Sequence, residues 1–262
     1  METIPSAKGR FHFRTGCPSY IYPADILSNV RKLASCVDAV EIVLFESSRP
    51  ENLPSGETCK ELASIGAGEN LSYIIHLPLD CRLGHSEREI RKYGAETFMT
   101  YIDATSAVNP ESYIIHFDPS GRGDGIDTWK NRLQEGMAEV CDTTGLTSDI
   151  AVEMLEYPFE DTAEIVESLG LSVCFEAGHL LLAEKNLVQY YESFKNRISV
   201  MHVHGVFQEK AHFPPDVMKP ADIEDLQNIL ERFTGIVIFE VFSCEYLRRT
   251  IEYMKRKLNV RA

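Results

Sequence analysis

The sequence lacks paired cysteine motifs, long apolar runs and low-complexity segments. Its seven cysteines are scattered, with no C-x-x-C spacing, and their odd number argues against a disulfide framework. No apolar run reaches the ~18 residues of a membrane span, and the polar first ten residues contain no signal-peptide core. We therefore expect free thiols, a cytoplasmic location and no membrane partner.

Basic residues are also scarce. Lysine and arginine number 26 against 40 acidic residues, which gives a formal net charge of -14. Proteins that grip nucleic acid neutralise its phosphates with lysine and arginine, so we expect no nucleic-acid partner. The only compact basic run, Lys255-Arg256-Lys257, is expected at the C-terminal end of a helix. A small anionic substrate stays compatible with this charge, because a local metal cluster can outweigh it.

Short runs rich in β-branched and aromatic residues alternate with amphipathic stretches. The expected strands are residues 11–16, 39–46, 71–77, 112–118, 150–155, 171–177, 198–204 and 235–242. The expected helices are residues 24–36, 57–65, 86–107, 128–140, 161–169, 185–194, 221–233 and 244–258. Eight strands and eight helices in strict alternation predict an α/β fold, a (β/α)8 TIM barrel that forms one domain over residues 1–262. A doubly wound sheet is the alternative.

Histidines and glutamates gather at the C-terminal ends of these expected strands, or in the loops just beyond them. TIM barrels build their active sites at this end. His76 and His116 each end a Y-I-I-H run, and two histidines fall in M-H-V-H-G-V. The whole set is His76, His116, His179, His202, His204, His212, Glu153, Glu176 and Glu240.

Taken singly, a histidine at a strand end is more often a hydrogen-bonded structural residue, and a glutamate there is often a surface residue or a helix cap. Together, several glutamates in apolar strands would repel one another and lose water at high cost. Divalent cations resolve that conflict, because they supply positive charge and accept lone pairs. The set therefore predicts a metal centre. His12 and His85 are expected to be structural or solvated, and Cys174 and Cys244 to be small buried hydrophobes.

This pattern resembles the xylose-isomerase-like barrels. The likeness lies in histidines ending strands three and four, a glutamate on strand five, an acid-x-x-His after strand six, a histidine on strand seven and a glutamate on strand eight. More narrowly it resembles the branch that contains the apurinic/apyrimidinic endonucleases, which cleave phosphodiesters with a metal cluster.

A second resemblance is narrower still. The segments Y-P-A-D-I-L, H-L-P-L-D-C-R-L-G, E-M-L-E-Y-P and F-E-A-G-H-L-L are similar to those of the cobamide-remodelling phosphodiesterase (CbiR) family. That resemblance implies hydrolysis of the nucleotide-loop phosphodiester of adenosylcobamides, with an adenosylcobamide as the small-molecule substrate.

The resemblance implies two to three divalent metal ions (Mn, Zn, Fe or Co) in three places. The first place would use His76, His116 and Glu153, and the second would share Glu153 and add Glu176, His202 and Glu240. The third would use His179 and His212. Two departures from the superfamily pattern bear on this: Glu176 stands where an aspartate is usual, and Lys210-Ala211-His212 contains no aspartate.

The expected catalytic residues are Glu153, Glu240, Glu176 and Arg82. Glu153 would bridge two ions, while Glu240 or Glu176 would orient the attacking water. Arg82 would clamp the phosphate with its planar fork, or else form a surface salt bridge. Three tyrosines would line a wide mouth or simply pack, namely Tyr20, Tyr22 and Tyr157.

Three other functions compete with this interpretation. A sugar isomerase or epimerase shares the barrel but, in many cases, uses one metal with two Glu, an Asp and a His. An apurinic/apyrimidinic endonuclease-like repair nuclease is disfavoured by the acidic charge, and a non-catalytic cobamide- or metal-binding protein is the third. The sequence leaves the oligomeric state open.

Overall fold

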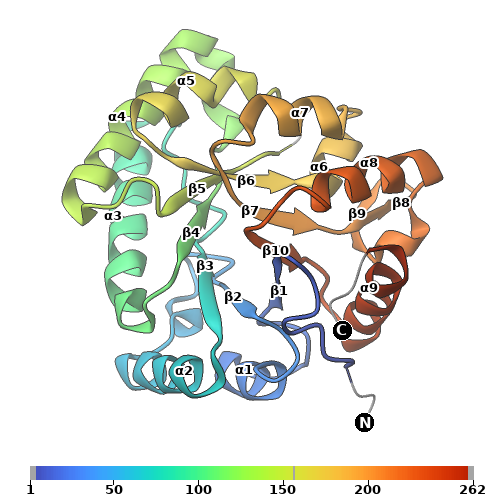
Figure 1. The fold of residues 1–262 in the computed structure, drawn as a ribbon. Helices are drawn as coiled ribbons and strands as arrows, with labels where there is room; N and C mark the ends of the chain where they lie inside the picture. The colour runs from blue at the N-terminus through green and yellow to red at the C-terminus, as the bar shows by residue number, and fades with distance from the viewer. Residues whose placement is uncertain (1–3, 156, 259–262) are drawn as a thin grey trace.

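Eight parallel strands close into a barrel in the computed structural model, which describes residues 4–155 and 157–258 (Figure 1). Neighbouring strands follow the order β1-β10-β7-β6-β5-β4-β3-β2. The strands are β1 (Arg14–Pro18), β2 (Ala39–Val43), β3 (Ser72–His76), β4 (Ser112–Ile115), β5 (Ile150–Glu153), β6 (Ser172–Glu176), β7 (Ile198–Val203) and β10 (Ile236–Phe239).

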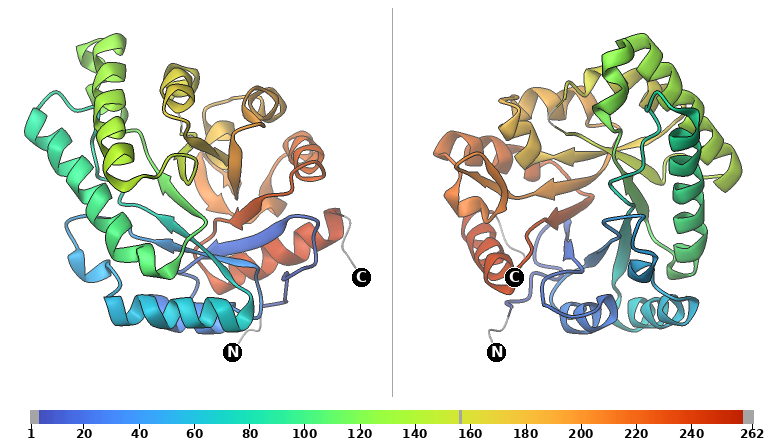
Figure 2. Two further views of the ribbon diagram at one scale, coloured as in Figure 1. Left: turned by 60° about the vertical axis from the view of Figure 1, so that its left-hand side comes forward. Right: turned by 180° about the vertical axis from the view of Figure 1, so that it is seen from behind.

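Helices surround the barrel, as the two further views show (Figure 2). They are α1 (Ile26–Leu33), α2 (Gly56–Glu69), α3 (Arg88–Thr105), α4 (Ile126–Thr144), α5 (Glu160–Ser168), α6 (Ala177–Leu182), α7 (Leu187–Phe194), α8 (Pro220–Leu230) and α9 (Cys244–Lys257). The predicted α/β fold and (β/α)8 barrel are confirmed, and the doubly wound alternative is wrong because the sheet closes.

Local sequence signals fix where several helices begin. Helices α1, α2 and α9 are N-capped by Asp25, Ser55 and Ser243. In each case a side-chain oxygen accepts a hydrogen bond from a backbone N–H of the first turn. This N-cap bond satisfies a donor that the helix itself leaves unpaired. At the other end of α9, Lys255, Arg256 and Lys257 lie in the last turn, as expected.

Two elements interrupt the strict alternation that the sequence predicted. Helix α6 begins directly after β6, so His179 lies on a helix where a loop was expected. A two-stranded antiparallel hairpin, β8 (Gly205–Phe207) and β9 (Lys210–Phe213), follows β7 and carries His212. Both insertions lie at the C-terminal end of the barrel.

The first strand was predicted too early. Residues 11–13 precede β1, so the placement of His12 in strand one was wrong. The apolar alternation there has another cause: Phe11 and Phe13 are buried and stack with centroids 5.1 Å apart. Burial of aromatic surface, rather than sheet pairing, explains this pattern.

The barrel interior begins with an apolar layer. It consists of Ala39, Ile74, Ile114, Ala151, Cys174, Val200, Ile236 and Ile238, all nearly inaccessible to solvent. Strand β1 contributes Gly16 here, because a Cβ at this position would overlap the side chain of Ile238. Cys174 is buried as expected, whereas Cys244 is only partly buried. None of the seven cysteines forms a disulfide in the described part of the chain, in agreement with that prediction.

Within the described part of the chain, no helix combines the length and apolarity that a bilayer crossing requires. Residues 1–3 of the expected non-signal N-terminus and Glu156 of the E-M-L-E-Y-P segment lie outside the described residues.

Candidate metal centre

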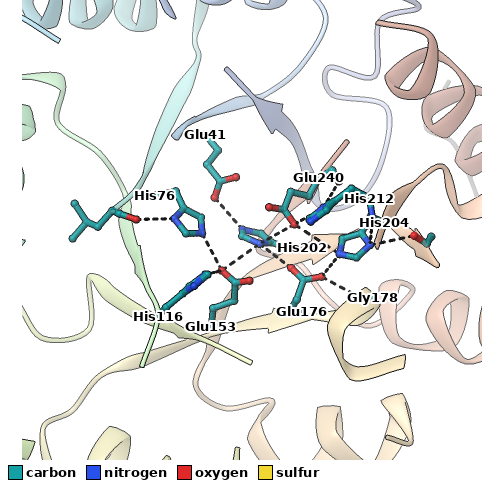
Figure 3. A network of polar contacts seen from close by, with 12 residues as sticks. Glu41, His76, His116, Glu153, Glu176, Gly178, His202, His204, His212 and Glu240 are labelled. Carbon is teal, nitrogen blue, oxygen red and sulfur yellow. Dashed lines mark hydrogen bonds and ion pairs between the residues drawn. The ribbon is translucent and has the colours of Figure 1, made fainter. Parts of the chain in front are cut away.

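A ring of ionisable side chains lies one step above the apolar layer. Side chains alternate between the two faces of a strand, so the residue two positions after each layer residue also points inward. On seven strands that residue is ionisable: Glu41, His76, His116, Glu153, Glu176, His202 and Glu240. Figure 3 shows these side chains converging from separate strands. All but His116 are buried.

The first group in this ring is His76, His116 and Glu153. Oε2 of Glu153 lies 3.0 Å from Nε2 of His76 and 2.9 Å from Nε2 of His116. Nδ1 of His76 donates to the carbonyl of Leu77 over 3.0 Å, which leaves Nε2 facing the group. One carboxylate oxygen thus meets two imidazoles from neighbouring strands.

His202 occupies the centre of the ring (Figure 3). Its Nδ1 lies 2.9 Å from Oε2 of Glu176, 3.6 Å from Oε2 of Glu240 and 3.9 Å from Oε2 of Glu153. Its Nε2 lies 2.9 Å from Oε1 of Glu41. Glu153, Glu176, His202 and Glu240 form the second group: the first three bring ligand atoms within 4.8 Å of one another, and Glu176 and Glu240 do so with His204.

A third group consists of imidazoles alone. His179 from α6, His204 at the end of β7 and His212 from β9 bring their ring nitrogens within 4.8 Å of one another. His204 and His212 lie with ring centroids 4.3 Å apart, and the centroids of His179 and His212 are 5.7 Å apart. Nε2 of His204 also lies 2.9 Å from Oε1 of Glu176, which joins this group to the ring.

Several buried atoms in these groups make no hydrogen bond within the described structure. They are Oε2 of Glu176, Nδ1 of His202, Nε2 of His204 and Oε2 of Glu240. The first two are only 2.9 Å apart, yet their directions do not suit a hydrogen bond. Buried polar atoms normally have a hydrogen-bond partner, whereas these four lie close to one another without one. The donor set of imidazoles and carboxylates therefore fits divalent cations.

Electrostatics of the ring reflect this crowding. Burial would raise the pKa of Glu153, but His116 and His76 outweigh burial and hold that pKa well below its usual range. Burial, with the charges of Glu176 and Glu153, raises the pKa of Glu240 well above its usual range. Protons bound to some side chains of the ring thus neutralise negative charge that a bound cation would otherwise neutralise.

The pKa values of the histidines shift in different directions. Burial would lower the pKa of His76 and His202, but the hydrogen bond to Glu153 raises that of His76, and Cys174, Glu41 and Glu240 raise that of His202. At His212 burial dominates, and with the charge of His204 it lowers the pKa to about 4. His212 is therefore neutral at pH 7.

A cavity of about 630 Å³ lies among the loops at the C-terminal end of the barrel. Its lining comes from the loops after β2, β3 and β4 and includes Phe45, Leu79, Arg49, Arg82 and Asp118. Arg82 is half exposed, and its Nε lies 3.8 Å from Oδ2 of Asp118. Arg82 thus takes part in a loose ion pair while it faces a cavity large enough for a ligand.

All eight residues predicted as metal ligands fall within these groups: His76, His116, Glu153, Glu176, His179, His202, His212 and Glu240. Their role as ligands stays a prediction. Sequence reasoning left His204 out of the ligand set and missed Glu41 altogether. The signal that finds Glu41 is its position two residues after Ala39, the same step that separates His76 from Ile74.

Residues 30–257 match the family described as the xylose isomerase-like TIM barrel. The chain belongs to this family. No curated protein matches the sequence. Membership of this family agrees with the broader of the two resemblances seen in the sequence. The family match is not specific to the cobamide-remodelling branch.

Solved structures of similar fold include enzymes of different activity. A D-tagatose 3-epimerase-like protein is 19% identical, with a TM-score of 0.78 and coverage of 94% of this chain and 97% of that one. Endonuclease IV from Thermus thermophilus is 15% identical, with a TM-score of 0.70 and coverage of 93% and 98%. The IOLI protein, solved with a zinc atom, is 13% identical, with a TM-score of 0.70 and coverage of 94% and 96%. At these identities the likeness shows the shared fold alone.

Proposed function

We propose that this protein is a metal-dependent phosphodiesterase that hydrolyses the nucleotide-loop phosphodiester of adenosylcobamides. One observation carries the proposal: the candidate ligand groups overlap, with Glu153 shared by the first and second groups. Shared carboxylates are suited to hold two divalent ions close together, an arrangement used for in-line displacement at phosphorus.

The chain offers ligands for two to three divalent ions. His76, His116 and Glu153 would hold the first, and Glu153, Glu176, His202 and Glu240 the second. His179 and His212 would hold the third, beside His204, whose Nδ1 accepts a hydrogen bond from the backbone N–H of His212. Mn, Zn, Fe and Co all accept such imidazole and carboxylate sets. When bound, such ions polarise phosphoryl oxygens and lower the pKa of an attacking water toward ~7.

Protein side chains would position the reactants. Oε2 of Glu240 is buried and makes no hydrogen bond within the described residues, so Glu240 is suited to accept a hydrogen bond from the attacking water. Glu176, at the end of β6, would orient that water. Arg82, which lines the cavity among the loops after β2, β3 and β4, would bind the non-bridging phosphate oxygens with its planar guanidinium group.

Two features support a cobamide as the substrate. The sequence segments similar to the cobamide-remodelling family include the loop that carries Arg82. At the rim, Tyr20 contacts Phe45 and Phe45 contacts Phe242, with ring centroids 5.0 and 6.1 Å apart. These partly exposed rings offer a surface for a large flat ligand.

The other two tyrosines have packing roles. Tyr157 packs edge-on against Trp129, and Tyr22 packs against the core with its hydroxyl 3.9 Å from the sulfur of Cys244. Of Tyr20, Tyr22 and Tyr157, we therefore propose only Tyr20 as part of the surface for the ligand.

The test is to incubate the metal-loaded protein with adenosylcobalamin and follow the release of cobinamide products by chromatography. Elemental analysis of the same sample should give two to three ions per chain. Absence of product with Mn, Co, Zn and Fe each supplied, together with isomerisation of a sugar, would overturn the proposal.

A sugar epimerase is the second candidate. It is favoured by the carboxylate-rich second group, Glu153, Glu176, His202 and Glu240, and by solved epimerases of this fold. The all-imidazole third group has no task in a one-metal epimerase, which is why the diesterase ranks first. An endonuclease fits the fold, but the net charge of -14 disfavours a nucleic-acid substrate.

A further inference from the structure

We infer that Glu41 is a positioning residue that holds His202 with Nδ1 directed at the second ligand group. The inference rests on the metal-binding part of the proposed function and is independent of the substrate. Glu41 lies in the middle of β2, and its side chain is completely inaccessible to solvent.

The contact between the two residues is direct. Oε1 of Glu41 accepts a hydrogen bond of 2.9 Å from Nε2 of His202, whose side chain is also fully buried. The other ring nitrogen, Nδ1, faces oxygens of Glu176, Glu240 and Glu153. Figure 3 shows Glu41 on one side of the imidazole and Glu153 and Glu176 on the other.

Packing does not explain a glutamate at this position. The flanking residues of β2 are apolar and buried, and an apolar side chain would avoid the cost of burying a carboxylate. Oε2 of Glu41 makes no hydrogen bond within the described structure, so the carboxylate is only half satisfied. What Glu41 provides is therefore its one bond to His202.

That bond sets which nitrogen of His202 carries the proton. A carboxylate at Nε2 keeps the hydrogen there, so the lone pair of Nδ1 faces the ligand group. Carboxylate partners of this kind orient metal-binding histidines and make them more basic, and their loss weakens metal affinity by about 10- to 100-fold. Glu41 belongs to none of these candidate ligand groups, which fits a supporting role.

Two substitutions separate the parts of this role in the full-length chain. Glu41→Gln keeps the length and an oxygen that accepts from Nε2 but removes the charge. Glu41→Leu removes both. Glu111→Gln is the matched control, because Glu111 pairs with Arg14 at the opposite end of the barrel. The measurement is the dissociation constants of Mn²⁺ and Co²⁺, by competition with a chelator, after stripping of bound metal.

We expect Glu41→Leu to weaken one class of site by about 10- to 100-fold, Glu41→Gln to weaken it less, and Glu111→Gln to match the wild type. Affinities within twofold of the wild type in both Glu41 variants would overturn the inference. If Glu41→Leu does not fold, two other measurements test the inference: the metal affinity of Glu41→Gln and nitrogen-15 NMR of the zinc-loaded wild type. Zinc on Nδ1 and hydrogen on Nε2 of His202 support the inference, and the reverse refutes it.

The outcomes also separate this inference from the proposed function. If the wild type binds metal but does not cleave adenosylcobalamin, the proposed diesterase function is excluded. The Glu41 measurement still tests the inference in that case. A wild type that cleaves adenosylcobalamin while the Glu41 variants bind metal normally removes the inference alone.

Discussion

The backbone N–H of His212 donates a hydrogen bond of 3.0 Å to Nδ1 of His204. This bond attaches the β8–β9 hairpin to the end of β7 and brings two imidazoles together. His212 adopts a φ of 62° to make it. A left-handed conformation costs a non-glycine residue on the order of 1–3 kcal/mol, so the surrounding structure, and not local chain preference, places this imidazole.

Replacing His212 with asparagine should remove one metal ion without unfolding the protein. Asparagine tolerates positive φ, so the hairpin keeps its shape while the third group loses a ligand. We expect metal content by elemental analysis to fall by up to one ion per chain, with the melting temperature nearly unchanged. Gln208→Asn, in the turn of the same hairpin at a φ of 48°, is the control; equal metal content in both variants would contradict the third site.

Gly178→Ala should disturb the same group from the other side. A Cβ at Gly178 would overlap the imidazole of His204, and overpacking of this kind costs about 1–3 kcal/mol. We expect a lower midpoint in urea denaturation and loss of metal from the third group. Gly68→Ala in α2, where nothing lies within 4 Å, should be neutral or stabilising. A Gly178 variant as stable as the Gly68 variant would show that His204 moves aside freely.

Glu153→Gln should affect metal binding and activity most. The substitution neutralises the carboxylate shared by two ligand groups and leaves His76 and His116 without their anionic partner. We expect cleavage to fall by more than the about 100-fold attributed to a supporting residue, with loss of metal from both groups. Glu164→Gln, on α5 with its side chain 80% exposed, is the control. Full metal content in Glu153→Gln would exclude Glu153 as a bridge.

Metal binding should release protons near neutral pH. The pKa values of His76 and His202 lie above 6.5 in the protein without a bound ion, whereas a metal ligand must be the neutral imidazole. Affinity at the first and second groups should therefore rise as pH rises through these raised values. His212, with a pKa of about 4, should release none. Calorimetry in two buffers of different ionisation enthalpy measures the release, and equal heats in both would contradict it.

Arg82→Lys tests the phosphate clamp. Lysine keeps the charge but loses the planar fork that matches two phosphate oxygens. We expect KM to rise by roughly tenfold, the loss of about 1.4 kcal/mol, with metal content unchanged. Arg132→Lys, where the arginine pairs with Asp124 away from the ring, should leave KM unchanged. An unchanged KM in Arg82→Lys would assign Arg82 to its ion pair with Asp118.

The barrel was predictable from the sequence because its strands are buried on both faces and read as continuous apolar runs. The hairpin was not, because its turn is Gln208-Glu209, both at positive φ, whereas asparagine and glycine are the usual signals of such turns. Helix α6 escaped notice because it has only six residues. Periodicity needs a longer window than that.

The candidate site was predictable where a polar residue ended a strand. His76 and Glu176 are the last residues of β3 and β6, and Glu153 is the last of β5. Glu41 lies two residues before the end of β2, so a search of strand ends passes over it. The register of the closed barrel, which no single strand reveals, is what places Glu41 level with His202.

The complete apolar layer beneath the ionisable ring has a kinetic consequence. Apolar side chains of the strands, with Cys174 among them, fill the barrel on that side, so a substrate enters from the opposite end. On the proposed function, the product has to leave by the route through which the substrate arrived. A retained product would consequently obstruct the next molecule, and inhibition by product should be competitive.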